Sequence, residues 1–387
     1  MERGLSGTYD RMTIGGETVQ AFVPLPLPPN PRLDLDGPLQ QLFESAVLAL
    51  GRLDSITTLL PDEELFLYAY VRKEAVLSSQ IEGTQSSLSD LLLFELEDVP
   101  GTPNLDVHEV SNYVAAMEHG LNRLKNNFPL SNRLIREAHK ILLSHGRVSS
   151  KSPGEFRRSQ NWIGGTRPGN AIYVPPPQTV LPDCMAEFER FLHTEDDGLP
   201  VLLRAGLAHV QFETIHPFLD GNGRVGRLLI TLLFCQAGIL HQPMLYLSLY
   251  FKQHRSEYYE LLNNVRLTGN WEAWLTFFLE GVKFTADVAV GTVQRLNLMF
   301  REDRDRIEEV AGRKAGSALR VHEALKSQML LSLPATRLKT GLSYQAAATA
   351  MDLLVSLGNA QEITGKRRNR LYVYKKYLSI LNEGTEV

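Results

Sequence analysis

The chain has 387 residues, of which 43% are hydrophobic and 22% charged, and this composition excludes an intrinsically disordered chain. A formal net charge of -4 and a pI near 6.2 argue against attraction of the whole molecule to nucleic acid or anionic membranes. The two cysteines are far apart, and no apolar run reaches the roughly 18 residues that a membrane span needs, so we expect a cytoplasmic protein without a membrane segment.

Residues 1–31 are polar and then rich in proline, which predicts an extended arm rather than a helix. From residue 38 onward, apolar residues recur at helical spacing, so we expect a body that is mainly α. Helices are expected at 38–60, 62–82, 107–126, 131–145, 178–193, 200–214, 224–238, 254–265, 271–285 and within 290–330. The exception is Asn161–Pro177, where two short extended pieces joined by a Gly/Pro turn predict a hairpin-like flap.

The last part of the chain has a different pattern. Ser343–Leu357 has helical spacing, and Gln361–Tyr374 alternates as two short strands, an order that predicts a winged helix. Such a fold serves as a DNA reader, a dimer contact or a docking module, and no Arg or Lys lies in 343–357, so DNA binding stays open. The basic residues on the expected wing are Lys366, Arg367, Arg368, Arg370, Lys375 and Lys376.

The segment His216–Arg227 is the one best suited to phosphate chemistry. Gly221 and Gly223 permit positive φ, so successive N–H groups can turn inward where the next helix begins, and the positive end of that helix favours an anion. Arg224 and Arg227 lie three residues apart on the first helical turn and add two positive charges near one face. The pattern predicts an anion site.

Two further residues of the segment suit the chemistry around such a site. Asp220 is a hard oxygen ligand beside the predicted phosphate site, the usual arrangement for Mg²⁺. His216 has a side chain whose ordinary pKa suits removal of a proton from an attacking hydroxyl. Together they predict a metal-assisted transfer reaction.

Three other interpretations compete with this one. The string G-x-G-x-x-G at 221–226 matches the dinucleotide fingerprint, but it lacks the preceding strand and the acidic residue about 20 positions later. His209, Glu213 and His216 have the spacing of metal ligands on one helical face, but no partner Glu-x-x-His motif occurs. A structural turn with polar caps leaves the crowding of a His, an Asp and two Arg unexplained.

The segment resembles the signature of the Fic family, H-x-F-x-[D/E]-G-N-G-R-x-x-R, at every specified position. The resemblance implies a Fic-type helical core that transfers AMP from ATP, with Mg²⁺, to Ser, Thr or Tyr hydroxyls of target proteins. It implies that His216 is the base, Asp220 the Mg²⁺ ligand, Arg227 the partner of the terminal phosphate and Phe218 a buried anchor. The residues implied to contact the nucleotide are Gly221, Asn222, Gly223, Arg224, Val225, Gly226, Arg227, Tyr258, Tyr259 and Glu82. The two tyrosines suit a helical core equally well.

Glu82 and Gly83 stand at the expected end of the helix 62–82. A carboxylate near a helix C-terminus costs about 0.3 to 1 kcal/mol when exposed, so a cationic partner would explain it, as would a solvated surface position. The inhibitory helix of the Fic family carries [S/T]-x-x-x-E-[G/N], which Ser78, Glu82 and Gly83 match. The resemblance implies that Glu82 pairs with Arg227 and withdraws the charge that should hold the γ-phosphate.

Several alternatives remain within this resemblance. A glutamate so placed can also position water, so hydrolytic removal of AMP is a competing activity. Transfer of another nucleotide also stays open. The resemblance implies three parts, an N-terminal helical region at 1–105, a catalytic domain at 106–288, and a linker helix with winged helix at 289–387. It also implies that a target protein docks on the flap 161–177. A homodimer is left open, and no membrane partner is expected.

Overall fold

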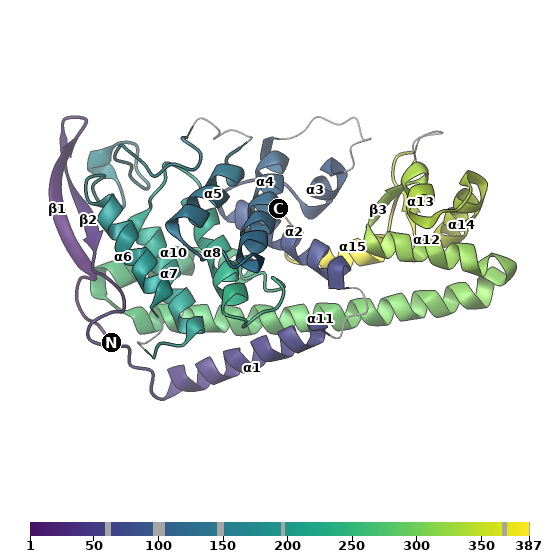
Figure 1. Cartoon of the computed structure of the whole chain (residues 1–387), viewed down its shortest axis with the longest axis horizontal. Helices are drawn as coiled ribbons and strands as arrows, with labels where there is room; N and C mark the ends of the chain where they lie inside the picture. Colours follow the sequence, from purple (N-terminus) through teal and green to yellow (C-terminus); the bar gives the residue numbers. More distant parts are fainter. Residues whose placement is uncertain (59–62, 96–104, 145–150, 195–197, 366–369, 387) are drawn as a thin grey trace.

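The computed structural model describes residues 1–58, 63–95, 105–144, 151–194, 198–365 and 370–386. Helices predominate among these residues and strands are few and short, which confirms the prediction of a mainly helical fold. One end of the molecule holds an N-terminal hairpin and the helices around the predicted catalytic loop, and the other end holds a small distal unit (Figure 1). A single long helix, α11 (Trp271–Ala311), runs beneath both ends (Figure 1).

The first part of the chain forms a bundle whose apolar faces meet in one core. Its helices are α1 (Pro38–Thr58), α2 (Glu63–Ile81), α3 (Leu88–Phe94), α4 (Leu105–Lys125), α5 (Asn132–Leu142), α6 (Leu181–His193), α7 (Val201–Ile215), α8 (Asn222–Gln236), α9 (Ser248–Gln253) and α10 (Arg255–Thr268). Helices α7 and α8 are buried along most of their length and pack on each other, as expected of helices that are apolar all round. The loop between them is therefore set into the core.

Helix α3 was not predicted, although its start carries a recognisable signal. Ser87 accepts a hydrogen bond from the backbone of Asp90, and the Asp90 carboxylate accepts from Ser87 N at 2.8 Å, which together form a capping box. The helix has only seven residues, so its apolar positions are too few to establish a period.

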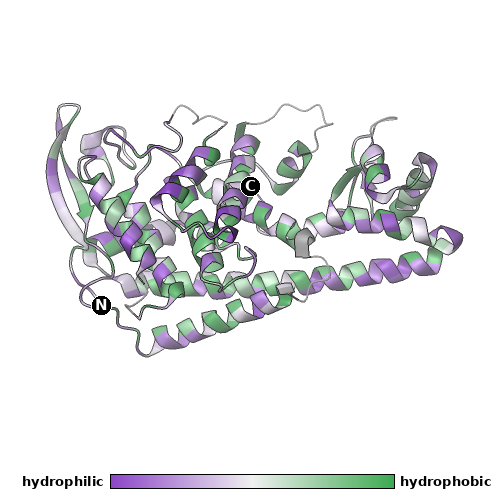
Figure 2. Ribbon diagram, viewed as in Figure 1, coloured by the Kyte–Doolittle hydropathy of each residue, from purple (hydrophilic) through white to green (hydrophobic). Residues whose placement is uncertain are grey.

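Helix α11 (Trp271–Ala311) has 41 residues and packs along α1. It joins the helix predicted at 271–285 to the next helical stretch, so the predicted boundary between 288 and 289 lies inside a helix. Hydrophobic and hydrophilic residues both occur along its length (Figure 2), because one face packs on the bundle while the other meets water. No helix in the described part of the chain combines the length and apolar character needed to cross a membrane.

The distal unit (residues 315–373) combines short helices with an antiparallel sheet of strand order β3-β5-β4. This unit and the helix that follows it comprise α12 (Ala315–Ser327), β3 (Leu330–Ser332), α13 (Leu333–Thr340), α14 (Tyr344–Ser356), β4 (Gln361–Glu362), β5 (Leu371–Val373) and α15 (Lys375–Asn382). The helix and the two strands predicted here are confirmed, whereas β3 and α15 were not predicted. The predicted wing residues Lys366, Arg367 and Arg368 lie outside the described residues.

The prediction of extended backbone rather than a helix over residues 1–31 is confirmed for its first part, but its pairing into a hairpin was not predicted. Strands β1 (Gly7–Ile14) and β2 (Glu17–Pro24) form an antiparallel hairpin in which Ile14 pairs with Glu17. Gly15 and Gly16 form its two-residue turn with φ of 58° and 86°, a conformation that favours glycine. The Gly-Gly pair between alternating segments was the available signal, and the prolines that follow obscured it.

This hairpin is attached to the predicted flap at Asn161–Pro177. Phe22 N donates to Val174 O at 2.9 Å, and the Glu17 carboxylate pairs with Arg167 at the tip of the flap. The flap itself is an irregular hairpin with one antiparallel bridge, between Ile163 and Tyr173. Its shape is thus set partly by a segment more than 140 residues earlier in the chain.

Candidate active site

The predicted catalytic loop joins α7 to α8 and is closed by its own side chains. His216 ends α7 in the left-handed region with φ 49°, and Gly221 precedes α8 with φ 79°. The Asn222 side chain spans the turn, since its Oδ1 accepts from Phe218 N at 2.9 Å and its Nδ2 donates to Phe218 O at 2.9 Å. Asn222 therefore shapes the loop with its side chain and leaves its backbone N–H for an anion at the start of α8.

Phe218 is fully buried, as predicted, and lies on the ring of His139 with centroids 3.6 Å apart. His139 Nδ1 accepts from Gly154 N at 2.8 Å, so its proton lies on Nε2, which donates to Asp220 O at 3.0 Å. Burial lowers the pKa of His139 to about 4, so the ring is neutral at pH 7. His139 fixes the loop from α5, and no sequence motif marks it.

His216 is held by its backbone and leaves its ring in a shielded position. Arg157 Nε donates to His216 O at 3.1 Å, and the side chain of His216 is 19% exposed. Burial lowers the pKa of His216 to about 4. The imidazole is therefore neutral at pH 7, which is the form that accepts a proton.

Glu213 lies one helical turn before His216, and its Oε2 is 4.0 Å from His216 Nδ1. Burial raises the pKa of Glu213 to about 7, although Arg227 acts in the opposite direction. A Cβ added to Gly226 would lie 2.6 Å from Glu213 Oε1, so glycine is required where the two helices approach. The sequence marked Glu213 only as a metal ligand with His209, but His209 Nε2 lies instead 2.8 Å from the hydroxyl of Tyr258.

The two arginines of the loop have different ion-pair partners, although the charges of both lower the pKa of Glu82. Arg224 is buried, with Nη1 3.1 Å from Glu109 Oε2 on α4 and Nη2 3.2 Å from Asp220 Oδ1. Two carboxylates thus already surround its guanidinium, and one of these contacts fixes the position of the Asp220 side chain. The side chain of Asp220 is 36% exposed, so its carboxylate lies at the surface while it contacts the buried Arg224.

Arg227 contacts Glu82, the partner that the family resemblance implied, and also Ser78 of the same motif. Its Nε donates to Ser78 Oγ at 2.9 Å, and its Nη2 donates to Ser78 O at 2.9 Å and to Glu82 Oε1 at 2.7 Å. Burial by itself would raise the pKa of Glu82, but the guanidinium of Arg227 outweighs it and the pKa is lowered. Glu82 is therefore ionised at pH 7, and Gly83 follows it with φ 96°, where the chain turns away from α2.

Glu82 also covers the start of α8. A Cβ added to Gly223 would lie 2.1 Å from Glu82 Oε1, so the carboxylate oxygen rests directly on the backbone of the first helical turn. The N-terminus of a helix attracts anions through its N–H groups and its dipole. The carboxylate thus lies against the first turn of α8, the segment where the sequence predicted an anion site.

The remaining predicted nucleotide contacts divide into buried and accessible residues. Val225 and Tyr258 are buried in the core, and Tyr258 stacks on Phe251 at 4.7 Å. Tyr259 is 40% exposed, with the Arg255 guanidinium 5.1 Å from its ring centroid. Burial, then the charge of Glu82, raises the pKa of Tyr259 to about 12. Arg255 Nε also donates to Ile81 O at 3.2 Å, so Arg255 connects Tyr259 to the residue that precedes Glu82. Tyr259 is the aromatic residue that remains available to a ligand.

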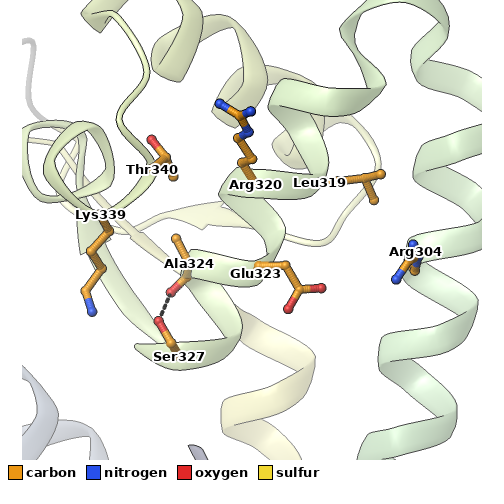
Figure 3. A pocket seen from close by; sticks show the side chains of 8 residues that line it. All are labelled: Arg304, Leu319, Arg320, Glu323, Ala324, Ser327, Lys339 and Thr340. Carbon is orange, nitrogen blue, oxygen red and sulfur yellow. Dashed lines mark hydrogen bonds between the residues drawn. The ribbon is translucent and has the colours of Figure 1, made fainter. Parts of the chain in front are cut away.

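A separate hollow lies on the distal unit and the far part of α11 (Figure 3). It is lined by Arg304, Leu319, Arg320, Glu323, Ala324, Ser327, Lys339 and Thr340. Its lining includes basic side chains from α11, α12 and α13 and one acidic side chain, Glu323, so the surface is basic on balance. None of the predicted active-site residues lines it.

Two regions of the chain match sequence profiles of one family. Residues 40–122 match the Fic/DOC family N-terminal profile, and residues 129–234 match the Fic/DOC family profile. The protein adenylyltransferase Fic of Culex quinquefasciatus is 32% identical over 256 residues, which are 63% of this chain and 47% of that protein. The protein of the same name from Aedes aegypti is 33% identical over 223 residues, 56% of this chain and 41% of that protein. This chain thus spans less than half the length of these relatives.

Solved structures show the same fold. A Fic family protein from Desulfovibrio desulfuricans G20 superposes with a TM-score of 0.54 at 19% identity, over 88% of this chain and 96% of that chain. A Fic domain containing signaling protein from Bacteroides thetaiotaomicron VPI-5482 superposes with a TM-score of 0.52 at 19% identity, over 64% of this chain and 97% of that chain. The chain therefore contains a Fic/DOC domain, preceded by the N-terminal region of the same family.

Proposed function

We propose that this chain is a protein adenylyltransferase, which transfers AMP from ATP to a Ser, Thr or Tyr hydroxyl of a target protein. The names of the relatives from Culex quinquefasciatus and Aedes aegypti support this reaction. The observation that carries the proposal is a neutral imidazole, His216, across one short loop from a helix N-terminus and from the guanidinium of Arg227. A base beside an anion site is the arrangement that nucleotidyl transfer needs.

In the proposed reaction, the target hydroxyl oxygen bonds to the α-phosphorus of ATP. The bond from that phosphorus to the oxygen bridging to the β-phosphate breaks, and pyrophosphate leaves. The hydroxyl proton passes to His216 Nε2, because Nδ1 is the ring nitrogen beside Glu213. The N–H groups at the start of α8 would hold the α-phosphate, and Arg227 would hold the γ-phosphate once Glu82 has left.

Asp220 and Tyr259 complete the proposed site. Asp220 suits Mg²⁺, because its carboxylate is partly exposed next to the proposed phosphate position and is oriented by Arg224. When bound, the ion would neutralise charge that develops on the phosphates. Tyr259 is proposed to pack on the adenine, since its ring is accessible and is connected through Arg255 to the residue that precedes Glu82.

We propose further that Glu82 inhibits the enzyme and that α2 is its inhibitory helix. The carboxylate competes with the γ-phosphate for Arg227 and with the α-phosphate for the start of α8. An ATP molecule bound beside an intact pair would lack its terminal anchor, so its α-phosphorus would be misaligned for attack. Removing the carboxylate should therefore raise the rate of transfer.

Hydrolytic removal of AMP from modified targets is the second candidate. The observation that favours it is the position of Glu82, whose side chain is 35% exposed inside the proposed site and is ionised. A carboxylate so placed can orient a water molecule toward a phosphorus atom. In that reaction Glu82 would be required rather than inhibitory, which separates the two candidates experimentally.

The flap and the distal unit supply the proposed protein contacts. We propose that a target segment docks along 161–177, where Trp162 and Ile172 present exposed apolar surface. The distal unit is proposed to be a winged helix, and its basic hollow (Figure 3) is the observation that keeps DNA contact open. Salt-dependent retention of the full chain on duplex DNA would support that contact. A homodimer is tested separately by light scattering.

The unpaired thiols of Cys184 and Cys235 suit our proposal of a cytoplasmic location.

The proposed activity is tested with ATP labelled at either the α- or the γ-phosphate. Wild type, Glu82→Gly and His216→Ala are incubated with Mg²⁺ and a cell lysate, and protein-bound label is followed. We expect α-label only, more of it with Glu82→Gly and none with His216→Ala. Absence of α-label from every folded variant would contradict the proposal. Loss of preloaded label on addition of wild type but not of Glu82→Gly would instead support the hydrolase.

A further inference from the structure

The chain returns from the distal unit to the catalytic half. After β5, helix α15 runs back toward α2, and the end of the chain lies beside the bundle that holds the active site (Figure 1). Residues 383–386, which follow α15, are named the strap here. Thr385 is 2% exposed and its hydroxyl donates to Asn382 O at 2.9 Å, so the strap is a folded turn packed on the bundle.

Backbone carbonyls of the strap accept hydrogen bonds from side chains of α2 and α9. Lys73 Nζ donates to Glu383 O at 2.8 Å, and Gln80 Nε2 donates to Thr385 O at 2.9 Å. Lys252 Nζ donates both to Glu386 O at 2.6 Å and to Gln80 Oε1 at 2.7 Å. The strap, α2 and α9 are thus connected by a chain of hydrogen bonds.

Two further features show that the strap is fitted to this position. Lys73 is 2% exposed, and its ammonium lies 4.6 Å from the ring centroid of Tyr246, so without the Glu383 carbonyl a buried cation would lose a hydrogen-bond acceptor. Gly384 has φ 84°, and a Cβ there would lie 2.6 Å from Leu249 Cδ1 on α9. Both features require the strap to lie close against the bundle.

The strap holds the turn of α2 that carries the inhibitory glutamate. Gln80, which bonds Thr385 O, lies two residues before Glu82. We propose that the strap is a restraint on α2, which keeps Glu82 opposite Arg227 and links the position of the distal unit to the inhibited state. This inference rests on the proposed inhibitory role of Glu82, and it adds the element that controls it.

The connection to the distal unit is direct. The hydroxyl of Tyr374, at the start of α15, donates to Asp303 Oδ2 on α11 at 2.5 Å. The Tyr374 hydroxyl oxygen also lies 3.0 Å from His322 Nε2 on α12. Tyr377 on α15 is fully buried and packs edge-on against Phe300. Because α15 is anchored in this way, a partner that displaces the distal unit pulls on the strap, and the strap releases the last turn of α2.

The strap is tested in the full chain with Lys252→Met and Gly384→Val. The first removes the hydrogen bond from α9 to Glu386 O of the strap and the one from α9 to Gln80 on α2, and the second pushes the strap away from Leu249. Lys283→Met is the matched control, because Lys283 forms a surface pair with Asp287 on α11. Transfer of α-label and hydrogen exchange of the backbone over residues 76–83 are measured for each variant.

We expect both strap variants to exchange faster over residues 76–83 and to label roughly fivefold more than wild type, with the control unchanged. Adding Lys252→Met to Glu82→Gly should give no further increase, because the strap acts through Glu82. Unchanged exchange in the folded strap variants would overturn the inference. If Glu82→Gly labels more and the strap variants do not, the proposed restraint by the strap is wrong, whereas the proposed inhibition by Glu82 is supported. If Glu82→Gly has no effect, the proposed inhibition fails, and with it the control assigned to the strap.

Discussion

Arg227 Nη2 lies 2.7 Å from Glu82 Oε1, although the two residues are 145 positions apart in the chain. The same guanidinium donates to the hydroxyl and the carbonyl of Ser78. Three acceptor atoms from the last turn of α2 and the residue after it therefore bind Arg227. Oε1 of Glu82 also rests on Gly223 at the start of α8, so one carboxylate covers both groups that we propose to bind the nucleotide phosphates.

Ser78→Ala should release Arg227 only in part. It removes one charge-assisted hydrogen bond and leaves the Glu82 pair in place, so we expect transfer to rise by about fivefold or less, and by less than with Glu82→Gly. Ser79→Ala is the control, since Ser79 is equally buried and its hydroxyl has no hydrogen-bond partner in the described structure. Labelling from α-labelled ATP measures all three. A larger effect of Ser79→Ala than of Ser78→Ala would contradict the assignment.

The transfer rate of Glu82→Gly should be insensitive to mild acid. Burial lowers the pKa of His216 to about 4, so the base stays unprotonated well below the ordinary histidine range and loses activity only as the pH approaches 4. Initial rates between pH 4.5 and 8, with folding checked by circular dichroism at each pH, test this. An inflection near pH 6.5 would show that the ring is not shielded.

Glu213→Gln should stabilise the protein in alkaline solution. Burial raises the pKa of Glu213 to about 7, so its proton stabilises the fold at low pH and that stability is lost as the pH rises through 7. Glutamine mimics the neutral form, so the gain should be on the order of 3 kcal/mol at pH 8.5 and small at pH 5. Urea unfolding at both values measures it. Glu118→Gln, on the exposed face of α4, should change the free energy by less than about 0.5 kcal/mol.

Arg224→Met should destabilise the fold strongly. Arg224 is the buried partner of Glu109, and removing one member of a buried ion pair costs about 3 to 5 kcal/mol. Arg133→Met removes a cation whose side chain is 74% exposed, and it should cost less than about 1 kcal/mol. Equal unfolding midpoints for the two variants in urea would show that the Arg224 pair contributes nothing.

Most helices could be predicted because their apolar residues have a long, regular period. The pairing of Glu82 with Arg227 could be predicted only from a resemblance, since no local pattern connects positions 145 residues apart. The hairpin at residues 7–24 was missed because a proline-rich run followed it, although the Gly15-Gly16 turn was readable.

Two parts of the site depend on tertiary packing and had no signal in the sequence. His139 supports the loop through a ring contact and two hydrogen bonds from a different helix, and an isolated histidine carries no such information. The separation of Arg224 from Arg227 was also beyond prediction. Their spacing places the two side chains near one face of α8. It does not reveal that Arg224 pairs with Glu109 on α4, whereas Arg227 donates hydrogen bonds to α2.

The length of α11 determines how far its ends move when the helix bends. With 41 residues at about 1.5 Å each, it extends roughly 60 Å, and a bend of a few degrees near its middle would shift its far end by only a few ångströms. Such a shift is comparable to the length of a hydrogen bond. A small flexing of this one helix is therefore sufficient to break contacts at the other end of the chain, so its stiffness sets how sensitively the two halves respond to each other.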